Sequence, residues 1–215
     1  EHARTVLHYV YRPLIRNESP LLVMARRAAA LTKYAANAFL ATKISFINEI
    51  ADLCEKVGAD VQDVAKGIGM DSRIGPRFLM AGPGYGGSCF PKDTLALLKT
   101  GHDFEAPLRI VEAVTLSNDN RKRQMGRKVV HALGGDGHGK TVGILGLTFK
   151  ANTDDMRDSP ALAIVQALQD AGMTVRAYDP EGMEQAAKLL DGVTYCSDAY
   201  AALEGASAAV IVTEW

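Results

Sequence analysis

The sequence predicts an α/β protein in which a long central helical region is followed by a partial Rossmann-like domain with a parallel sheet. Three observations support this prediction. Residues 26–57 contain neither glycine nor proline, residues 67–88 contain nine of them, and residues 141–213 alternate between short apolar runs and helix signals. The boundary between the two regions is expected at 134–139, a short polar stretch rich in glycine.

Residues 1–25 are interpreted as the tail of an α/β domain. An amphipathic helix is expected through Val6 and Val10, a turn at 17–20, and a strand over the apolar residues 21–24. Because a lone strand cannot satisfy its backbone hydrogen bonds, the rest of its sheet is expected to precede this chain.

The segment 26–135 is expected to be a helical domain. Its first helix should cover 26–57 and end near Gly58. That helix carries one apolar stripe, formed by Leu40, Ile44, Ile47, Ala51 and Cys54. The stripe is longer than a small domain needs, so we expect it to bury against a second copy of the chain in a two-fold dimer. Further helices are expected at 60–67, 92–99 and 107–133.

Residues 136–215 predict the sheet domain. Ser159 followed by Pro160 is typical of a helix start, and Gly172 is typical of a helix end. Strands are expected at 141–147, 173–178, 193–196 and 208–213, with the later helices at 181–190 and 198–204. This alternation predicts parallel strands joined by right-handed crossovers. Sheets of this kind normally continue beyond a fourth strand, so the domain is expected to be truncated.

Composition narrows the class of protein. The formal net charge of −1 gives no basic field for nucleic acid and no acidic excess typical of disorder. The three cysteines, Cys54, Cys89 and Cys196, lie far apart without CxxC spacing, so neither a disulfide framework nor a metal site is expected. No apolar run approaches the ~20 residues that span a bilayer, and no signal peptide is recognisable. A cytoplasmic protein without membrane contact is expected.

The richest functional signal is the string Gly82-Pro-Gly-Tyr-Gly-Gly-Ser-Cys-Phe-Pro-Lys-Asp93. Its glycines let the backbone approach a ligand closely. Cys89 precedes an expected helix, and the positive end of a helix together with the nearby Lys92 would stabilise a thiolate. These features suit a nucleophile, whereas an isolated cysteine is more often simply packed in the interior.

This string resembles the signature of the UDP-glucose/GDP-mannose dehydrogenase family. Residues 69–75 and 78–82 are similar to its UDP-glucose branch, and residues 33–41 to its central helix. The resemblance spans essentially the whole chain, but the family's N-terminal NAD-binding domain is missing. It implies an NAD-dependent oxidoreductase that oxidises UDP-glucose twice to UDP-glucuronate. By the same resemblance, residues 1–25 would end the NAD-binding domain and residues 136–215 would bind the UDP-sugar.

The resemblance also implies roles for four catalytic residues. Cys89 would attack the C6 aldehyde, and the thiohemiacetal would be oxidised to a thioester that water hydrolyses. Asp93 would orient or activate the water, while Lys33 and Asn37 would stabilise the oxyanion. Residues four apart share a helix face, so Lys33 and Asn37 can point at one atom. Taken alone, Lys33 suits an exposed helix lysine and Asn37 a partner in helix packing.

Binding residues follow from the same resemblance. The substrate would contact Lys33, Asn37, Arg73, Phe78, Leu79, Met80, Ala81, Gly82, Gly86 and Lys150. Backbone N–H groups of the loop would face the diphosphate, and Arg73 would reach a substrate on the neighbouring subunit. Lys92 and Arg157 would contact the NAD pyrophosphate. The plain alternatives are a solvated loop arginine for Arg73, a helix-start lysine for Lys92, and a surface ion pair between Arg157 and a neighbouring aspartate.

Three alternatives stay open. Asp179 follows the second expected strand, where a Rossmann fold places a ribose-binding acid, but a turn before Pro180 explains it equally well. Asp179 is therefore not counted in the site. The substrate could be another nucleotide sugar, such as GDP-mannose, since enzymes for it share a similar string. The chain could also be a non-catalytic module for nucleotide-sugar binding and dimerisation.

Overall fold

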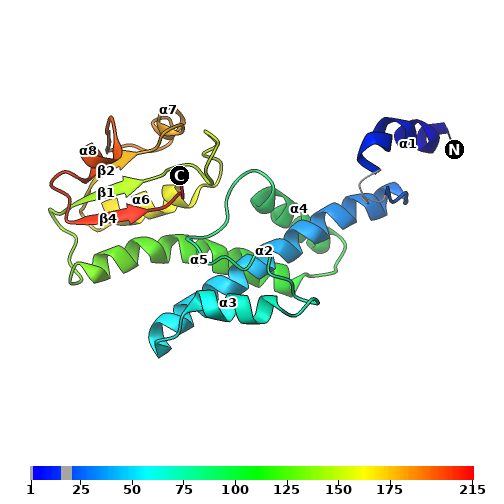
Figure 1. Ribbon diagram of the computed structural model, residues 1–215, viewed down its shortest axis with the longest axis horizontal. Helices are drawn as coiled ribbons and strands as arrows, with labels where there is room; N and C mark the ends of the chain where they lie inside the picture. The colour runs from blue at the N-terminus through cyan, green and yellow to red at the C-terminus, as the bar shows by residue number, and fades with distance from the viewer. Residues whose placement is uncertain (1, 16–20) are drawn as a thin grey trace.

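The computed structural model describes residues 2–15 and 21–215. Figure 1 shows helices at one end and a sheet at the other, joined by a long helix that reaches under the sheet. The first part contains α1 (His2–Ile15), α2 (Arg26–Val57), α3 (Val61–Gly69), α4 (Phe90–Asp103) and α5 (Arg109–Ala132). The second part contains β1 (Thr141–Leu145), α6 (Pro160–Asp170), β2 (Thr174–Tyr178), α7 (Met183–Ala186), β3 (Val193–Tyr195), α8 (Ala199–Leu203) and β4 (Ala208–Ile211). The predicted α/β class is confirmed.

The long helix α2 has the predicted limits. It ends where Gly58 adopts a φ of 74°, a conformation that glycine reaches without strain, and the Gly58 N–H donates to the Cys54 carbonyl. The predicted stripe, however, faces the interior: Ile47, Ala51 and Cys54 are buried, and α4 and α5 pack against α2. The expectation of a contact with a second copy of the chain is therefore wrong for these three residues, because neighbouring helices of the same chain cover them, whereas Leu40 and Ile44 are half-buried.

The strand expected at 21–24 is absent, and residues 21–25 have no regular structure. The expected turn at 17–20 lies outside the described residues. Within the described part of the chain, every sheet strand lies between Thr141 and Ile211, so no strand edge accompanies 21–24. Helix α1 is formed as predicted, but it has no buried residue and stands apart from the other helices in Figure 1.

Local capping fixes the shorter helices. The Asp60 side chain accepts from the Gln62 N–H at 2.8 Å and starts α3. Helix α4 begins at Phe90, two residues before the expected start, with Pro91 in its first turn. In α6 the Ser159 side chain accepts from the Ala161 N–H, as the Ser-Pro signal predicts. The remaining helix and strand predictions hold within a few residues, although α7 is much shorter than expected.

The sheet is parallel, with strand order β3-β2-β1-β4, which confirms the predicted parallel pairing. Its core lies between the strands and α6, and contains Val142, Ile144, Val175, Ile164 and Leu168. Helix α5 packs on α6 and ties the two parts together. The contact needs Gly126, because a Cβ there would lie 2.7 Å from the Ala167 Cβ. Among the described residues, no helix is long and apolar enough to cross a membrane.

Candidate functional site

Asp93 lies at the meeting point of α2 and α4. Its carboxylate accepts from Lys33 Nζ at 3.1 Å and from Asn37 Nδ2 at 2.5 Å, and it also pairs with Lys92 Nζ. Asp93 is 1% exposed, whereas the lysine side chains are largely exposed. Lys33 and Asn37 do point at one group, as their four-residue spacing predicts. Within this structure that group is the Asp93 carboxylate.

The electrostatics of this cluster keep Asp93 ionised. The hydrogen bond from Lys92 lowers the pKa of Asp93, burial opposes that effect, and hydrogen bonds from Lys33 and Asn37 add to it, so the pKa ends below its ordinary value. The same contact with Asp93 raises the pKa of Lys92. At neutral pH the centre of the cluster is therefore a carboxylate held between two ammonium groups.

Cys89 lies at the edge of this cluster and is exposed. It occupies the N-cap position of α4, and its carbonyl accepts from the Asp93 N–H at 2.9 Å. The helix therefore places the thiol and the carboxylate one turn apart. Asp93 chiefly raises the pKa of Lys92 and Asp155 chiefly raises that of Arg157, and Cys89 contributes least to both, which places two cations near the sulfur. An exposed thiol among cations is the environment of a reactive cysteine.

The loop before Cys89 lines an open groove of about 760 Å³. The groove is lined by Ile44, Asn48, Pro76, Arg77, Phe78, Met80, Gly82, Gly84 and Tyr85. Phe78 has a φ of 64° and its ring packs edge-on against Phe90. Leu79 is buried, while Met80 is exposed and Ala81 is partly buried. Of the four expected substrate residues 78–81, Phe78 and Met80 line the groove, whereas Leu79 and Ala81 do not.

Two glycines expected at the substrate have protein neighbours. The Gly82 N–H donates to Asn48 Oδ1 at 2.8 Å, so it is not free for a diphosphate in this structure. Gly86 packs so closely on Asp158 that a Cβ would collide with its carbonyl oxygen. The N–H of Gly87, its neighbour, donates to the Arg157 carbonyl at 2.8 Å. The loop thus bridges the helical part and the sheet part of the chain.

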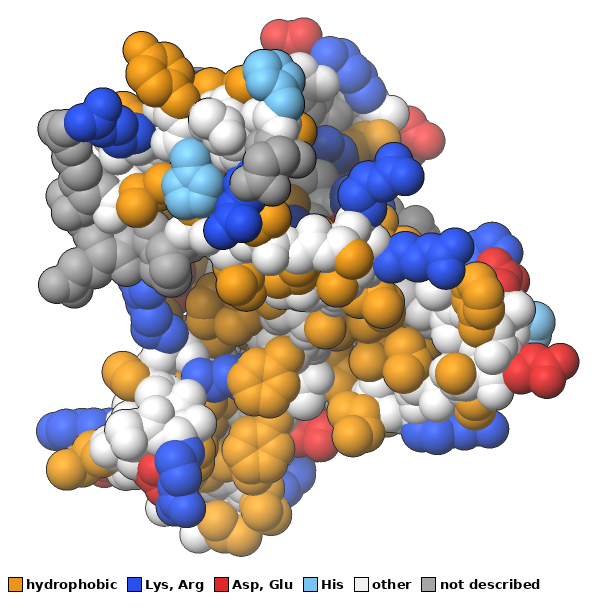
Figure 2. All heavy atoms as spheres, turned by 90° about the vertical axis from the view of Figure 1, so that its right-hand side faces the viewer, with side chains coloured by type: hydrophobic (Ala, Val, Ile, Leu, Met, Phe, Trp, Pro, Cys, Tyr) orange, Lys and Arg blue, Asp and Glu red, His pale blue; other side chains and the backbone are white. Residues whose placement is uncertain are grey.

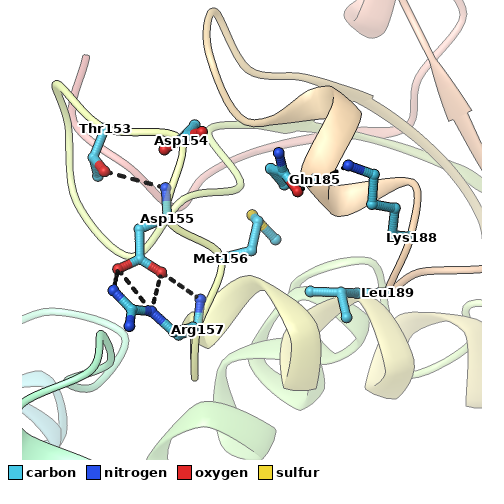
Figure 3. Close-up of a pocket in the computed structure, with 8 residues that line it drawn as sticks. All are labelled: Thr153, Asp154, Asp155, Met156, Arg157, Gln185, Lys188 and Leu189. Carbon is cyan, nitrogen blue, oxygen red and sulfur yellow. Dashed lines mark hydrogen bonds and ion pairs between the residues drawn. The ribbon is translucent and has the colours of Figure 1, made fainter.

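Three exposed cations lie further from the Asp93 cluster. Arg157 forms a two-pronged ion pair with Asp155, which is the plain alternative noted from the sequence. Figure 3 shows this pair beside a pocket of about 440 Å³. Arg73 pairs in the same way with Asp71, and Lys150 Nζ lies 5.4 Å from the centre of the Phe149 ring. Asp155 and Asp71 raise the pKa values of Arg157 and Arg73.

Asp179 is fully buried and accepts six hydrogen bonds, four of them from backbone N–H groups. They join the end of β1 to the turn after β2. Burial raises the pKa of Asp179, but the backbone donors outweigh burial and the pKa is lowered. Both carboxylate oxygens are thus engaged within the chain, and Asp179 holds the end of β1 against the turn after β2.

Sequence reasoning missed several polar residues that support the loop. Asn48, Asn118, Arg121 and Lys122 are all buried and contact residues 82–85 or Asp158. The available signal was their spacing. Polar side chains at 118, 121 and 122 are three and four residues apart and therefore share one face of the helix predicted there. Among the described residues, no group of three or more His, Cys, Asp or Glu side chains is arranged to hold a metal ion.

Comparison with known proteins identifies the family. Residues 27–120 match the central domain of the UDP-glucose/GDP-mannose dehydrogenase family, and residues 143–215 match its UDP-binding domain. The UDP-glucose 6-dehydrogenase of Rhizobium meliloti is 66% identical over 99% of this chain and 49% of its own length. TuaD, the UDP-glucose 6-dehydrogenase of Bacillus subtilis, is 46% identical over 99% of this chain and 46% of its own length.

A solved structure agrees with these matches. The UDP-glucose dehydrogenase of the archaeon Pyrobaculum islandicum superposes with a TM-score of 0.92 and 40% identity, covering 100% of this chain and 49% of that one. The chain therefore spans about half the length of the relatives it matches. Because the two matched domains cover most of its residues and relatives align over its whole length, the chain belongs to the UDP-glucose/GDP-mannose dehydrogenase family.

Proposed function

We propose that this chain supplies the catalytic cysteine and the UDP-sugar-binding part of an NAD-dependent UDP-glucose 6-dehydrogenase, which converts UDP-glucose to UDP-glucuronate. The observation that carries the proposal is the convergence of Lys33, Asn37 and Lys92 on Asp93, one helical turn from the exposed Cys89. The proposal is supported by the relatives described above, each of which is named as a UDP-glucose dehydrogenase.

Covalent catalysis begins at Cys89. The sulfur forms a bond to C6 of the sugar aldehyde, and the carbonyl oxygen takes up the proton to give a thiohemiacetal. Lys33 uses one of its three N–H groups to donate to Asp93, and Asn37 uses one of its two amide N–H groups. The remaining donors are available to hold the developing oxyanion. The hydrogen bonds to Asp93 thereby hold the Lys33 and Asn37 side chains in place before the substrate binds.

The cofactor site is proposed at the cations beside Cys89. Lys92 and Arg157 are exposed, and their positive charges can pair with a pyrophosphate. A bound NAD would supply the hydride acceptor for both oxidations, that of the alcohol and that of the thiohemiacetal, with one proton released in each. The thioester produced by the second oxidation would remain on Cys89. For this, the Arg157 guanidinium must either release Asp155 or bind Asp155 and the phosphate at the same time.

Hydrolysis of the thioester is assigned to Asp93. Since its pKa is lowered, Asp93 is a carboxylate at neutral pH and can orient a water molecule by accepting a hydrogen bond from it. Water then adds to the thioester carbonyl and the C–S bond breaks. One water proton passes to the Cys89 sulfur, the other is released to solvent, and the carboxylate product leaves. The bonds from Lys33 and Asn37 also make Asp93 a weaker base, so orientation of the water is its main contribution.

The UDP-sugar is proposed to lie between the glycine-rich loop and the sheet domain. The groove beside Phe78, Met80, Gly82 and Gly84 offers apolar and backbone contacts. Lys150 and Arg73 are exposed and can turn toward a diphosphate, Arg73 by reaching into a neighbouring subunit. GDP-mannose is the alternative ligand, and a direct comparison of UDP-glucose with GDP-mannose binding discriminates between them.

A homodimer is proposed through the outward face of α2. Phe39, Phe46 and Leu53 recur every seven residues and are 66%, 50% and 57% exposed. Large apolar side chains this exposed, in a regular row, are typical of a helix that packs on a partner. Figure 2 adds that hydrophobic side chains gather in a band at the end of the molecule that carries α1 and the start of α2.

A cytoplasmic location is also proposed for the protein, since the mechanism requires a reduced Cys89.

The decisive test is Cys89→Ser in the whole enzyme. A serine hydroxyl has no thiolate character at neutral pH, so UDP-glucuronate formation should fall below detection while UDP-glucose still binds. Cys196→Ser is the matched control, because Cys196 is buried in the sheet domain and its thiol donates to the Thr194 carbonyl, a bond that serine also makes. Normal turnover by Cys89→Ser would reject the covalent mechanism. Nucleotide-sugar binding without any NADH formation by the parent protein would favour the non-catalytic module.

A further inference from the structure

Helix α5 presents three buried polar side chains on one face. Asn118, Arg121 and Lys122 are 3%, 8% and 8% exposed, and their spacing of three and four residues places them side by side. Burying polar groups is unfavourable unless they are hydrogen-bonded. Each of the three is bonded to a backbone carbonyl, and together they contact the glycine-rich loop and the start of the sheet domain.

Asn118 holds Tyr85 at both of its backbone groups. Its Oδ1 accepts from the Tyr85 N–H at 2.8 Å and its Nδ2 donates to the Tyr85 carbonyl at 3.1 Å. The side chain therefore pairs with the loop as a neighbouring strand would. The approach requires glycine at position 84, where a Cβ would lie 3.0 Å from Asn118 Oδ1 and the φ is 119°. The sequence of the loop is thus matched to this one amide.

Arg121 holds Gly82 in a similar way, together with Asn48. Arg121 Nε donates to the Gly82 carbonyl at 3.0 Å, while the Gly82 N–H donates to Asn48 Oδ1 at 2.8 Å. Asp52 pairs with the other end of the guanidinium and fixes its orientation. Both backbone groups of Gly82 are therefore engaged, three residues before the one that Asn118 holds.

Lys122 extends the contact to the sheet domain. Its Nζ donates to the Asp158 carbonyl at 3.2 Å, and burial lowers the pKa of Lys122. The same carbonyl faces Gly86, and the adjacent Arg157 carbonyl accepts from the Gly87 N–H. Gly86 and Gly87 are thus packed against a segment that α5 itself holds in place.

We propose that Asn118, Arg121 and Lys122 are positioning residues for Cys89, and that Asn118 is the chief one. They fix the backbone at positions 82 and 85 and the surface on which 86 and 87 rest, and Ser88 alone separates this held segment from the thiol. This inference rests on the proposed role of Cys89 as the nucleophile. Helix α5 contacts no proposed reactant, but through the loop it determines the position of the Cys89 sulfur relative to Lys92 and Arg157.

The test compares two identical substitutions on α5, Asn118→Asp and Asn120→Asp, in the whole enzyme. At 118 the aspartate keeps an acceptor for the Tyr85 N–H but turns a second oxygen against the Tyr85 carbonyl. Asn120 is exposed and only accepts from Arg123, a bond that aspartate also makes. We expect kcat to fall about 10²-fold in Asn118→Asp, because misplacement by about 1 Å costs that much. KM for UDP-glucose should change less than kcat, and Asn120→Asp should match the parent.

A second readout does not depend on turnover. Without substrate, iodoacetamide should alkylate Cys89 several-fold more slowly at neutral pH in Asn118→Asp, because the sulfur moves away from Lys92 and Arg157. Asn118→Ala removes both bonds without burying a charge, and serves if the aspartate variant does not fold. Parent-like alkylation and parent-like kcat per folded molecule in either variant would overturn the proposal. If Cys89→Ser remains active while alkylation still slows, the mechanism fails but the positioning stands.

Discussion

The sharpest stability prediction concerns Asp179→Asn. In the folded protein, one carboxylate oxygen of Asp179 accepts from the N–H groups of Leu147 and Thr148 at 2.6 and 3.1 Å and from Trp215 Nε1 at 3.1 Å. The other oxygen accepts from the N–H groups of Glu181 and Gly182 at 3.0 and 2.6 Å. Both sides of the side chain therefore face donors only. An asparagine amide must turn its own donor toward one of them.

The magnitude follows from counting the bonds that the amide cannot make. The less costly orientation places the NH₂ group against Glu181 and Gly182, so two charge-assisted bonds are lost. At about 1.5–3 kcal/mol for a hydrogen bond to a charged group, the expected loss is about 3–6 kcal/mol. Asp179 is fully buried, so solvent offers no replacement partner. Since a domain is stabilised by only about 5–15 kcal/mol, the sheet domain should be much less stable or unfolded.

Trp215 makes the assay direct. It is the single tryptophan of this sequence and its indole N–H bonds to Asp179, so its fluorescence in urea reports on the affected site. The control is Asp198→Asn at the N-cap of α8, where asparagine caps as well as aspartate and the cost should be a few tenths of a kcal/mol. A loss below about 1 kcal/mol for Asp179→Asn, with an unchanged slope in urea, would refute the argument.

The same carboxylate predicts a pH dependence. The backbone donors lower the pKa of Asp179 in the folded state despite its burial, so the folded state holds the proton less tightly than the unfolded state. Its contribution to stability is therefore fully present above the unfolded pKa of about 3.9 and is lost as the pH falls through the folded pKa. Asp179→Asn should remove that part of the acid dependence.

Three further outcomes follow from the proposed function. Asp93→Asn should let Cys89 form the thioester but slow its hydrolysis about 10²- to 10⁴-fold, so mass spectrometry after one turnover should find the sugar on Cys89; a parent rate of hydrolysis would exclude water orientation. Phe46→Glu should convert the dimer to a monomer in sedimentation at micromolar concentration, and an unchanged dimer would exclude this face. Lys92→Met should raise the KM for NAD about tenfold more than that for UDP-glucose; equal changes would place Lys92 elsewhere.

Helix limits were predictable from the sequence because their signals are local. The absence of glycine and proline fixed α2, and Ser159 with Pro160 fixed the start of α6. Failures arose where the outcome depends on distant partners. The apolar run 21–24 has the composition of a strand but no neighbour in the described residues. On α2, two faces are apolar, and spacing alone cannot tell which one the same chain covers.

The site divides along the same line. The string ending in Asp93 indicated a nucleophile at a helix start, and the structure has Cys89 at that N-cap. The i, i+4 spacing correctly placed Lys33 and Asn37 on one target, but it could not name the target as Asp93, which is 56 residues or more away in sequence. The support from Asn118 was missed because an asparagine in a helix interior is ordinarily an exposed residue, and only the path of the loop makes it a partner.

Three of the four cations proposed to meet phosphate groups are paired with an aspartate. Arg73 and Arg157 each bond the aspartate two residues earlier through Nε and Nη2, and Lys92 pairs with Asp93. A pyrophosphate arriving at Arg157 therefore meets a neutralised pair, and long-range attraction contributes little to its capture. What the pair offers is a guanidinium already held in one orientation, with Nη1 making no bond to Asp155. Binding at these arginines should depend on the fit of the anion at close range, which favours a diphosphate of defined geometry over anions in general.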